Sequence, residues 1–299
     1  MVVPTYTYEN FPENTASCEG MQIIDGQDET GVSCKQDVVY AVKDGMALHL
    51  KMMFPSESGK DKKYPTVFHV QGSAFFKQNL HISMGTLMPL VRAGYGVIII
   101  EYRCIPRHRF PCQIEDGKTA VRYVMDHTQE YPIDTNNLYL SGDSSGGYTA
   151  MMMMATWGSR LCDAEGTPLP RLNACIDLYG SLNMLTMNNA PSAYNHNDMD
   201  SPASIYLGFP VKTNPKECLR QIPYTYIDES TPIPPVLIMH GSKDRTVPFT
   251  QSLEFYQHLK KHHKEAEFFK VRGADHGDNI FYCQAVMQTI IDFLNRHLR

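Results

Sequence analysis

The chain has 299 residues, 42% of them hydrophobic and 20% charged, and a net charge of -5 at pH 7. A chain of this length can bury a large core, and a single α/β domain of this size is common. The charges form no block of Lys and Arg and no basic amphipathic helix, which argues against nucleic acid or a membrane surface as a partner. The 8 cysteines include no Cys-x-x-Cys pair, so neither a disulfide framework nor a zinc site is indicated.

The N-terminal residues 1–10 contain neither a basic segment nor an apolar one, and no stretch of the chain is long enough to span a bilayer. These features predict a cytoplasmic protein. Residues 1–35 are polar and irregular, and they predict an extension that packs on the main domain. The main domain is expected to span residues 36–299.

Short apolar runs alternate with helical patterns along this domain. Residues 38–42 and 47–54 predict a hairpin, with an Asp-Gly turn at residues 43–46. Further strands are predicted at residues 65–70, 97–102, 137–141, 174–180, 236–241 and 267–271. Helices are predicted around residues 85–93, 114–129, 148–157, 252–263 and 284–299. The alternation predicts an α/β fold with a mostly parallel central sheet flanked by helices.

The hexapeptide GDSSGG at residues 142–147 lies between a predicted strand and a predicted helix. A Gly-x-Ser-x-Gly turn in this context is typical of a nucleophile elbow, which holds Ser144 at a sharp corner with its hydroxyl exposed. A Cβ at Gly142 or Gly146 would collide with the neighbouring strand or helix. The amide of Ser145 and the dipole of the following helix both favour a developing oxyanion. An ordinary glycine turn is the alternative interpretation.

The strand at residues 65–70 leads directly into the sequence QGSAFF at residues 71–76. In a hydrolase with such an elbow, the loop after the third strand supplies backbone N–H groups to an oxyanion hole, often from His-Gly-Gly-Gly. Here Gln71 takes the place of the histidine, and Ser73 and Ala74 take the places of the later glycines. These small residues still let the backbone approach a substrate. A plain loop is the alternative.

An acid and a histidine complete a candidate catalytic set. Asp244 follows the strand at residues 236–241, and His276 lies in a glycine-rich loop after the last strand. The chain order Ser144, Asp244, His276 is that of α/β-hydrolases. A serine hydroxyl attacks poorly alone, so His276 would take its proton and later deliver it to the leaving group, while Asp244 would orient the imidazole.

Other acids and histidines compete for these roles. Most of the 12 histidines are expected on the surface or in the core, including His240 at a strand end. Asp275 and Asp278 lie beside His276, but adjacent side chains diverge and neither follows the preceding strand. We therefore favour Asp244 as the acid, and we expect Asp143 to have a structural role.

Several spaced motifs, in the same order, are shared with a known group of enzymes. The sequence resembles α/β-hydrolase esterases of the hormone-sensitive-lipase type, and more closely the acetyl and feruloyl esterase branch, the BD-FAE group, found among carbohydrate-degrading bacteria. The resemblance covers most of the chain from about Val38 onward. Its motifs are residues 102–111, 115–123, 142–147, 201–208, 240–248 and 273–277.

The resemblance implies an α/β-hydrolase fold and the hydrolysis of esters with short acyl groups, acetyl above all, without a metal or organic cofactor. It also implies a site made of three side chains and three backbone amides. The triad would be Ser144, Asp244 and His276, and the oxyanion donors would be the amides of Ser73, Ala74 and Ser145.

Residues 181–232 differ in character from the rest of the domain. Asn, Pro, Met and Tyr are frequent there and periodicity is weak, which predicts an insertion of short helices and loops that lies over the active site as a partial lid. Aromatic residues at several places are candidates for lining the acyl or alcohol pocket, with core packing as the alternative. They are Phe75, Phe76, Tyr148, Tyr179, Tyr206 and Phe209.

Three functions remain open at this stage. The first is a serine carboxylesterase that acts on acetylated carbohydrates, aryl esters or similar small molecules through an acyl-enzyme. The second is a serine peptidase of the prolyl-oligopeptidase type, which is less expected because no propeller or other large domain precedes this one. The third is a catalytically silent binding protein on a hydrolase fold. The expected partner is a small-molecule ester, and a homodimer is left open.

Overall fold

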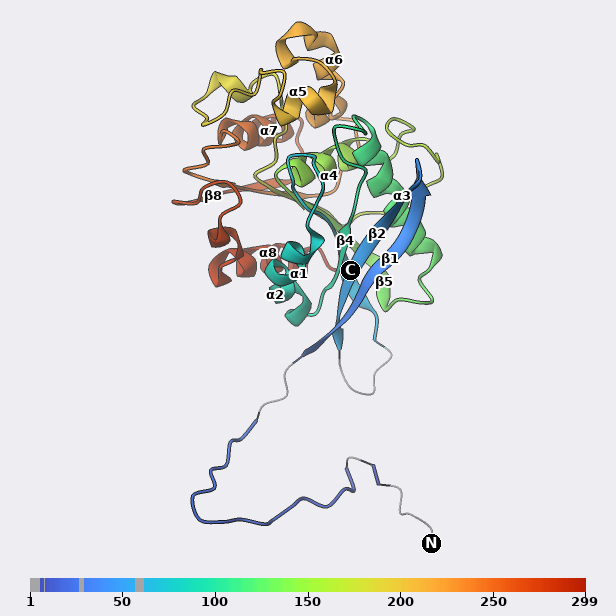
Figure 1. The fold of residues 1–299 in the computed structure, drawn as a ribbon, viewed down its shortest axis with the longest axis vertical. Helices are drawn as coiled ribbons and strands as arrows, with labels where there is room; N and C mark the ends of the chain where they lie inside the picture. The colour runs from blue at the N-terminus through green and yellow to red at the C-terminus, as the bar shows by residue number, and fades with distance from the viewer. Residues whose placement is uncertain (1–5, 8, 27–29, 57–61) are drawn as a thin grey trace.

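One eight-stranded sheet runs through the domain in the computed structural model, which describes residues 6–7, 9–26, 30–56 and 62–299 (Figure 1). The strands are β1 (Gly31–Lys43), β2 (Met46–Ser56), β3 (Tyr64–Val70), β4 (Gly96–Ile100), β5 (Ile133–Asp143), β6 (Ala174–Leu178), β7 (Val236–Gly241) and β8 (Ala266–Val271). Their order in space is β1-β2-β4-β3-β5-β6-β7-β8. The β1-β2 and β2-β4 pairs are antiparallel and the others are parallel, so the predicted mostly parallel sheet is confirmed.

The predicted N-terminal hairpin forms as β1 and β2. Asp44 and Gly45 both have positive φ angles, 51° and 76°, which is the conformation that a two-residue turn between twisted strands requires. β1 begins at Gly31, however, so the sheet starts inside the stretch predicted to be an irregular extension. The described residues 6–7 and 9–26 are exposed at every position and run away from the domain (Figure 1), in contrast to the packed extension predicted.

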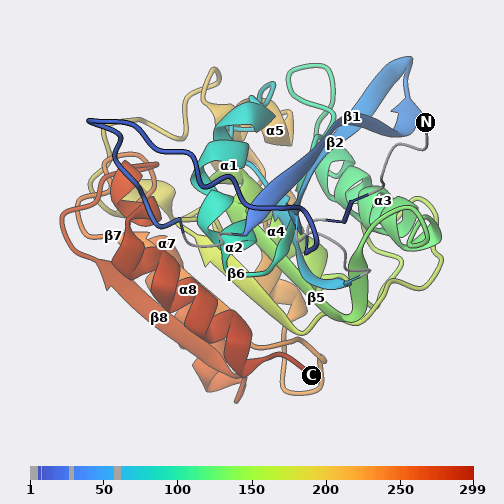
Figure 2. The same cartoon turned by 90° about the horizontal axis from the view of Figure 1, so that it is seen from below.

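Interior strands explain the unbroken apolar runs in the sequence. Every residue of β4, β6 and β7 is buried, because helices cover both faces of the parallel part of the sheet. One hydrophobic core forms against α3, α4 and α7, and the other against α1, α2 and α8 (Figure 2). The helices are α1 (Leu80–Thr86), α2 (Met88–Arg92), α3 (Cys112–Asp126), α4 (Ser145–Ala155), α7 (Thr250–Lys261) and α8 (Gln284–Arg296).

Two helices stand where the sequence predicts one, around residues 85–93. α1 ends at Thr86, and α2 carries Pro89 in its first turn, where the missing N–H of proline has no helical partner to lose. None of the helices in the described ranges has both the length and the apolar character needed to cross a membrane.

The segment between β6 and β7, residues 179–235, is described throughout and contains no strand. It consists of η1 (Met187–Asn189), α5 (Pro202–Leu207), η2 (Val211–Thr213), α6 (Pro215–Leu219) and η3 (Pro223–Tyr226). Both short α-helices begin with a capping side chain followed by proline, namely Ser201 for α5 and Asn214 for α6. The segment lies beyond the sheet at the same end as α7 (Figure 1).

Polar contacts fasten this insertion to α7. The N–H of Asn183 donates to Oε1 of Gln251 at 2.7 Å, and Nε2 of Gln251 donates to Oγ1 of Thr186 at 2.9 Å. The Thr186 hydroxyl in turn donates to Glu254 at 2.9 Å. These bonds fix the start of the insertion beside the carboxyl ends of β6 and β7.

Candidate active site

Ser144 occupies a strained corner between β5 and α4. Its φ of 53° and ψ of -125° lie in a region that residues other than glycine rarely adopt. The N–H of Ser144 donates to the carbonyl of Leu178 on β6 at 2.9 Å, which ties the corner to the sheet. A Cβ on Gly142 would collide with the backbone of Gly146, and a Cβ on Gly146 would collide with the carbonyl oxygen of Val70. Glycine at both positions therefore makes the turn sterically feasible.

Three side chains that are far apart in sequence form one chain of hydrogen bonds. Ser144 Oγ lies 2.7 Å from Nε2 of His276, and Nδ1 of His276 lies 2.8 Å from Oδ2 of Asp244. A carboxylate only accepts, so Nδ1 carries the ring hydrogen and Nε2 accepts from the serine hydroxyl. The ring of Tyr179 packs edge-on against the imidazole with 5.0 Å between centroids. This geometry suits Ser144 as a nucleophile with His276 as its base.

The side chain of Asp244 is fully buried and receives hydrogen bonds on both oxygens. Oδ1 accepts from the amides of Thr246 and Val247 at 2.9 and 2.8 Å, while Oδ2 lies 3.2 Å from Nε2 of His240. Burial raises the pKa of Asp244, but the hydrogen bonds from His240 and His276 outweigh it and hold the pKa well below its ordinary value. The carboxylate is therefore ionised, and it can stabilise an imidazolium at residue 276.

The two competing acids face other groups. Asp275 Oδ1 accepts from the amides of Arg245 and His276 at 2.9 and 2.8 Å, and its other oxygen pairs with the Arg245 guanidinium. Those bonds, led by the one from Arg245, lower the pKa of Asp275 to about 2. Asp278 caps η4 (Asn279–Tyr282) by accepting from the amide of Ile280 at 3.1 Å. Neither side chain contacts the imidazole through a hydrogen bond.

The loop after β3 is held by a hydroxyl of the elbow. Oγ of Ser145 accepts from the amide of Ser73 at 2.9 Å and from the amide of Phe75 at 3.2 Å. An N–H has one hydrogen, so the Ser73 amide, predicted as an oxyanion donor, is already committed to Ser145. Of the three predicted donors, the amides of Ala74 and Ser145 make no hydrogen bond to any other described residue.

Two further contacts hold this loop against the elbow. Oδ1 of Asp143 accepts from the amide of Gly72 and from Nε2 of His69, both at 3.1 Å. A Cβ on Gly72 would collide with the Asp143 backbone, so the two segments approach as closely as only glycine permits. The Ser73 hydroxyl lies 2.9 Å from the hydroxyl of Tyr102. Asp143 therefore has a structural role, as predicted, because it joins the loop after β3 to the elbow.

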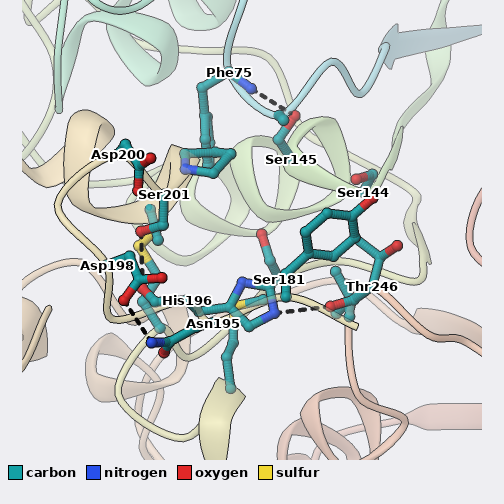
Figure 3. A pocket seen from close by; sticks show the side chains of 17 residues that line it. Phe75, Ser144, Ser145, Ser181, Asn195, His196, Asp198, Asp200, Ser201 and Thr246 are labelled. Atoms are coloured by element: carbon teal, nitrogen blue, oxygen red, sulfur yellow. Dashed lines mark hydrogen bonds between the residues drawn. The ribbon is translucent and has the colours of Figure 1, made fainter. Parts of the chain in front are cut away.

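A cavity of about 460 Å³ opens beside Ser144 (Figure 3). It is bounded by the loop after β3, the elbow, the insertion, and the segment that follows Asp244. Its lining residues are Ala74, Phe75, Ser144, Ser145, Ser181, Met184, Met187, Tyr194, Asn195, His196, Asp198, Asp200, Ser201, Pro202, Ala203, Thr246 and Val247. The volume is in the range of small-molecule sites.

Among the six aromatic candidates for the pocket, Phe75 lines this cavity, but Tyr148 and Tyr206 do not. Both tyrosines are fully buried behind Phe75. The rings of Phe75 and Tyr206 stack with 3.9 Å between centroids, and Tyr148 meets Phe75 edge-on at 5.5 Å. Their expected role as pocket residues is therefore wrong, because packing between α4 and α5 places them in the core.

The insertion supplies polar lining residues that the sequence analysis did not identify. They are Ser181, Asn195, His196, Asp198 and Asp200. Weak periodicity in residues 181–232 offers no signal for which side chains face inward. Their contribution to the cavity depends on how the insertion folds back over the elbow.

The mostly parallel sheet, the elbow and the order Ser144, Asp244, His276 define an α/β-hydrolase. The sequence model of the BD-FAE family matches residues 50–259, which is more than half of the chain, and the chain belongs to that family. The resemblance inferred from the sequence motifs is thereby confirmed.

Known relatives with esterase names are similar to the chain. Esterase LipC of Mycobacterium tuberculosis is 26% identical over 231 residues, which are 72% of this chain and 53% of LipC. The probable carboxylic ester hydrolase LipM of the same organism is 26% identical over 225 residues, 74% of this chain and 51% of LipM. The chain thus spans about half the length of these curated relatives.

Solved structures include similar folds over most of the chain. A truncated carbohydrate esterase from gut microbiota has a TM-score of 0.80 and 26% identity, covering 91% of this chain and 98% of its own. A bifunctional GH43-CE protein of Bacteroides eggerthii has a TM-score of 0.77 and 27% identity, covering 89% of this chain and 38% of its own.

Proposed function

We propose that this protein is a serine carboxylesterase that hydrolyses short-chain, acetyl-type esters of small molecules or carbohydrates through an acyl-enzyme. The observation that carries the proposal is the unbroken line of hydrogen bonds from Ser144 through His276 to the buried Asp244. Ser144, at one end of this chain of hydrogen bonds, lines a cavity large enough for a small molecule.

In the first step, Ser144 Oγ attacks the ester carbonyl carbon while its proton passes to Nε2 of His276. The carbonyl oxygen becomes an oxyanion, which the amides of Ala74 and Ser145 would stabilise by hydrogen bonds. The tetrahedral intermediate then breaks its bond to the alcohol oxygen, which receives the proton from His276. The products are the free alcohol and an acyl group on Ser144.

In the second step, a water molecule gives its proton to Nε2 of His276 and attacks the acyl carbon. Collapse of the new tetrahedral intermediate breaks the bond to Ser144 Oγ, which recovers its proton from the imidazolium. The carboxylic acid then leaves. Asp244 stays ionised throughout, as its lowered pKa allows, and it stabilises the positive charge on His276 in both steps.

The cavity supports an ester with one small apolar part and one polar part. Phe75, Met184 and Val247 give it apolar surface, whereas Asn195 and Asp198 bring polar groups from the insertion. A polar alcohol would find hydrogen-bond partners there. The similarity to a carbohydrate esterase from gut microbiota supports a carbohydrate as that alcohol.

The direct test is hydrolysis of p-nitrophenyl esters that vary in acyl length from acetate to octanoate. We expect the highest kcat/KM with acetate and loss of roughly 10⁶ in kcat in Ser144→Ala, as for other serine triads. Ser159→Ala is a matched control, because Ser159 is exposed and does not line the cavity. A fluorophosphonate should label the wild type and Ser159→Ala but not Ser144→Ala. Equal rates in wild type and Ser144→Ala would reject the proposal.

A peptidase is the second candidate, because one relative is named for the release of acylated amino acids. The acylamino-acid-releasing enzyme of Mus musculus is 26% identical over 246 residues, covering 76% of this chain and 30% of that protein. An acetylated amino-acid p-nitroanilide separates the two functions. If it were cleaved more efficiently than p-nitrophenyl acetate, after allowance for the poorer leaving group, the peptidase would be favoured.

A further inference from the structure

His196 is a buried histidine that lines the cavity beside Ser144. It comes from the insertion and is 6% exposed. Its Nε2 lies 2.9 Å from the carbonyl oxygen of Thr246 and 3.0 Å from Oγ of Ser192. Because a carbonyl oxygen only accepts, the ring hydrogen sits on Nε2.

The second nitrogen of this ring, Nδ1, makes no hydrogen bond to any residue in the described ranges. Figure 3 shows the bond to Thr246 on one side of the ring, with the other nitrogen turned away from Thr246. Burial lowers the pKa of His196, and the nearby His276 adds to the effect, so the imidazole is neutral at pH 7. Nδ1 is therefore a hydrogen-bond acceptor without a protein partner.

Ser181 provides a second unpaired polar group in the same cavity. It follows β6, is 8% exposed, and lines the cavity together with Ser144. Among the described residues its Oγ has no hydrogen-bond partner. Figure 3 labels Ser181 and His196 among the side chains that line this cavity. Neither atom is among the fully buried unpaired atoms of the described residues, so both remain accessible from the cavity. A ligand that displaces water from this part of the cavity must therefore pair with both atoms or leave them unpaired.

We propose that Nδ1 of His196 and Oγ of Ser181 form an alcohol-side subsite that binds the hydroxyl group next to the acetylated oxygen of a carbohydrate. A sugar hydroxyl can donate to Nδ1 and can also exchange a hydrogen bond with Ser181. A short acyl chain or an aryl alcohol offers neither group a partner. The subsite rests on the proposed esterase function and deepens it by naming the feature of the alcohol that is recognised.

The experiment compares two acetylated methyl pyranosides, one with a free hydroxyl beside the acetyl group and one with hydrogen in its place. Wild-type enzyme should cleave the hydroxylated sugar with a kcat/KM about tenfold or more above that of the deoxy sugar, as expected when an analogue leaves buried polar groups unpaired. Equal rates on the two sugars would overturn the subsite. This comparison needs no variant, so a folding defect cannot obscure it.

Two variants then assign the preference to residues. Ser181→Ala removes the hydroxyl, and His196→Gln keeps an N–H near the Thr246 carbonyl while removing the Nδ1 acceptor. Each should lower the preference for the hydroxylated sugar about three- to tenfold, the range for one lost neutral hydrogen bond. Ser192→Ala is the matched control, because Ser192 contacts the same imidazole but does not line the cavity. It should keep the preference.

Retention of the full preference in both Ser181→Ala and His196→Gln would overturn the assignment. Hydrolysis of p-nitrophenyl acetate by the wild type separates this failure from failure of the proposed function. If the wild type cleaves that ester but shows no preference between the two sugars, the subsite alone is wrong. If it cleaves neither kind of ester, the esterase function and the subsite both fall.

Discussion

The hydroxyl of Ser145 should be the main support of the candidate oxyanion loop, and Ser145→Ala tests this. Its Oγ accepts hydrogen bonds from the backbone N–H groups of Ser73 and Phe75, the two residues that flank Ala74. Ala74 and Phe75 have φ angles of 52° and 66°, a conformation that is unfavourable for residues with a Cβ. The two hydrogen bonds oppose the tendency of this loop to relax.

The magnitude follows from these contacts. Leaving one buried amide unpaired costs about 1–3 kcal/mol, so losing the shared acceptor would cost roughly 2–6 kcal/mol before the loop relaxes. Relaxation releases backbone strain of about 1–3 kcal/mol per residue, which favours a shifted loop. A shifted loop moves the Ala74 amide, and loss of one oxyanion donor costs about 10²–10³ in kcat. We expect kcat to fall about 10²-fold with little change in KM.

Steady-state hydrolysis of p-nitrophenyl acetate measures this effect. Ser73→Ala is the matched control, because it removes a hydroxyl that contacts Tyr102 and Phe76 but keeps the Ser73 amide. We expect less than about a tenfold loss of kcat there, the cost of one hydrogen bond. A Ser145→Ala enzyme with wild-type kcat, or one that lost affinity instead of kcat, would refute the reasoning.

Three more changes test the acid of the triad, the elbow and the buried carboxyl of Asp177. Asp244→Asn should lower kcat by about 10⁴, because its amide N–H₂ would face the ring N–H groups of His240 and His276. Gly146→Ala should destabilise the fold by roughly 3 kcal/mol or more in denaturant unfolding, because the new Cβ meets the Val70 carbonyl. Burial raises the pKa of Asp177 to about 8, so the folded state keeps a proton that the unfolded state releases above about pH 4. Stability should therefore fall as pH rises from about 4 to 8, and Asp177→Asn should flatten that dependence.

Each of these predictions has a control or a contrary outcome. Activity of Asp244→Asn within tenfold of wild type would show that His276 keeps its tautomer without the carboxylate. Gly158→Ala is the matched control for the elbow, because no atom lies within 4 Å of its added Cβ, and its unfolding midpoint should not fall. A thermal midpoint that rises between pH 4 and pH 8 in the wild type, and equally in Asp177→Asn, would exclude Asp177 as the cause.

Local patterns in the sequence were enough to predict the fold class and most of the sheet. The apolar runs of β4, β6 and β7 have this character because both faces of the sheet are covered. The Asp-Gly turn marks the hairpin because only a few residues tolerate positive φ at two successive positions. The order of Ser144, Asp244 and His276 was readable because each follows the carboxyl end of a strand, and parallel strands bring those ends to one edge.

The tertiary structure decided what faces the cavity. Tyr148 and Tyr206 are aromatic residues near the elbow, but packing between α4 and α5 turns them into the core. The sequence suggests the Ser73 amide as an oxyanion donor, but in the folded chain this amide donates to Oγ of Ser145. No sequence pattern marks His196 as a cavity residue, because its place there depends on how an irregular insertion packs beside the elbow. Periodicity in a sequence records burial against a regular element, whereas contacts between irregular segments exist only once the chain has folded.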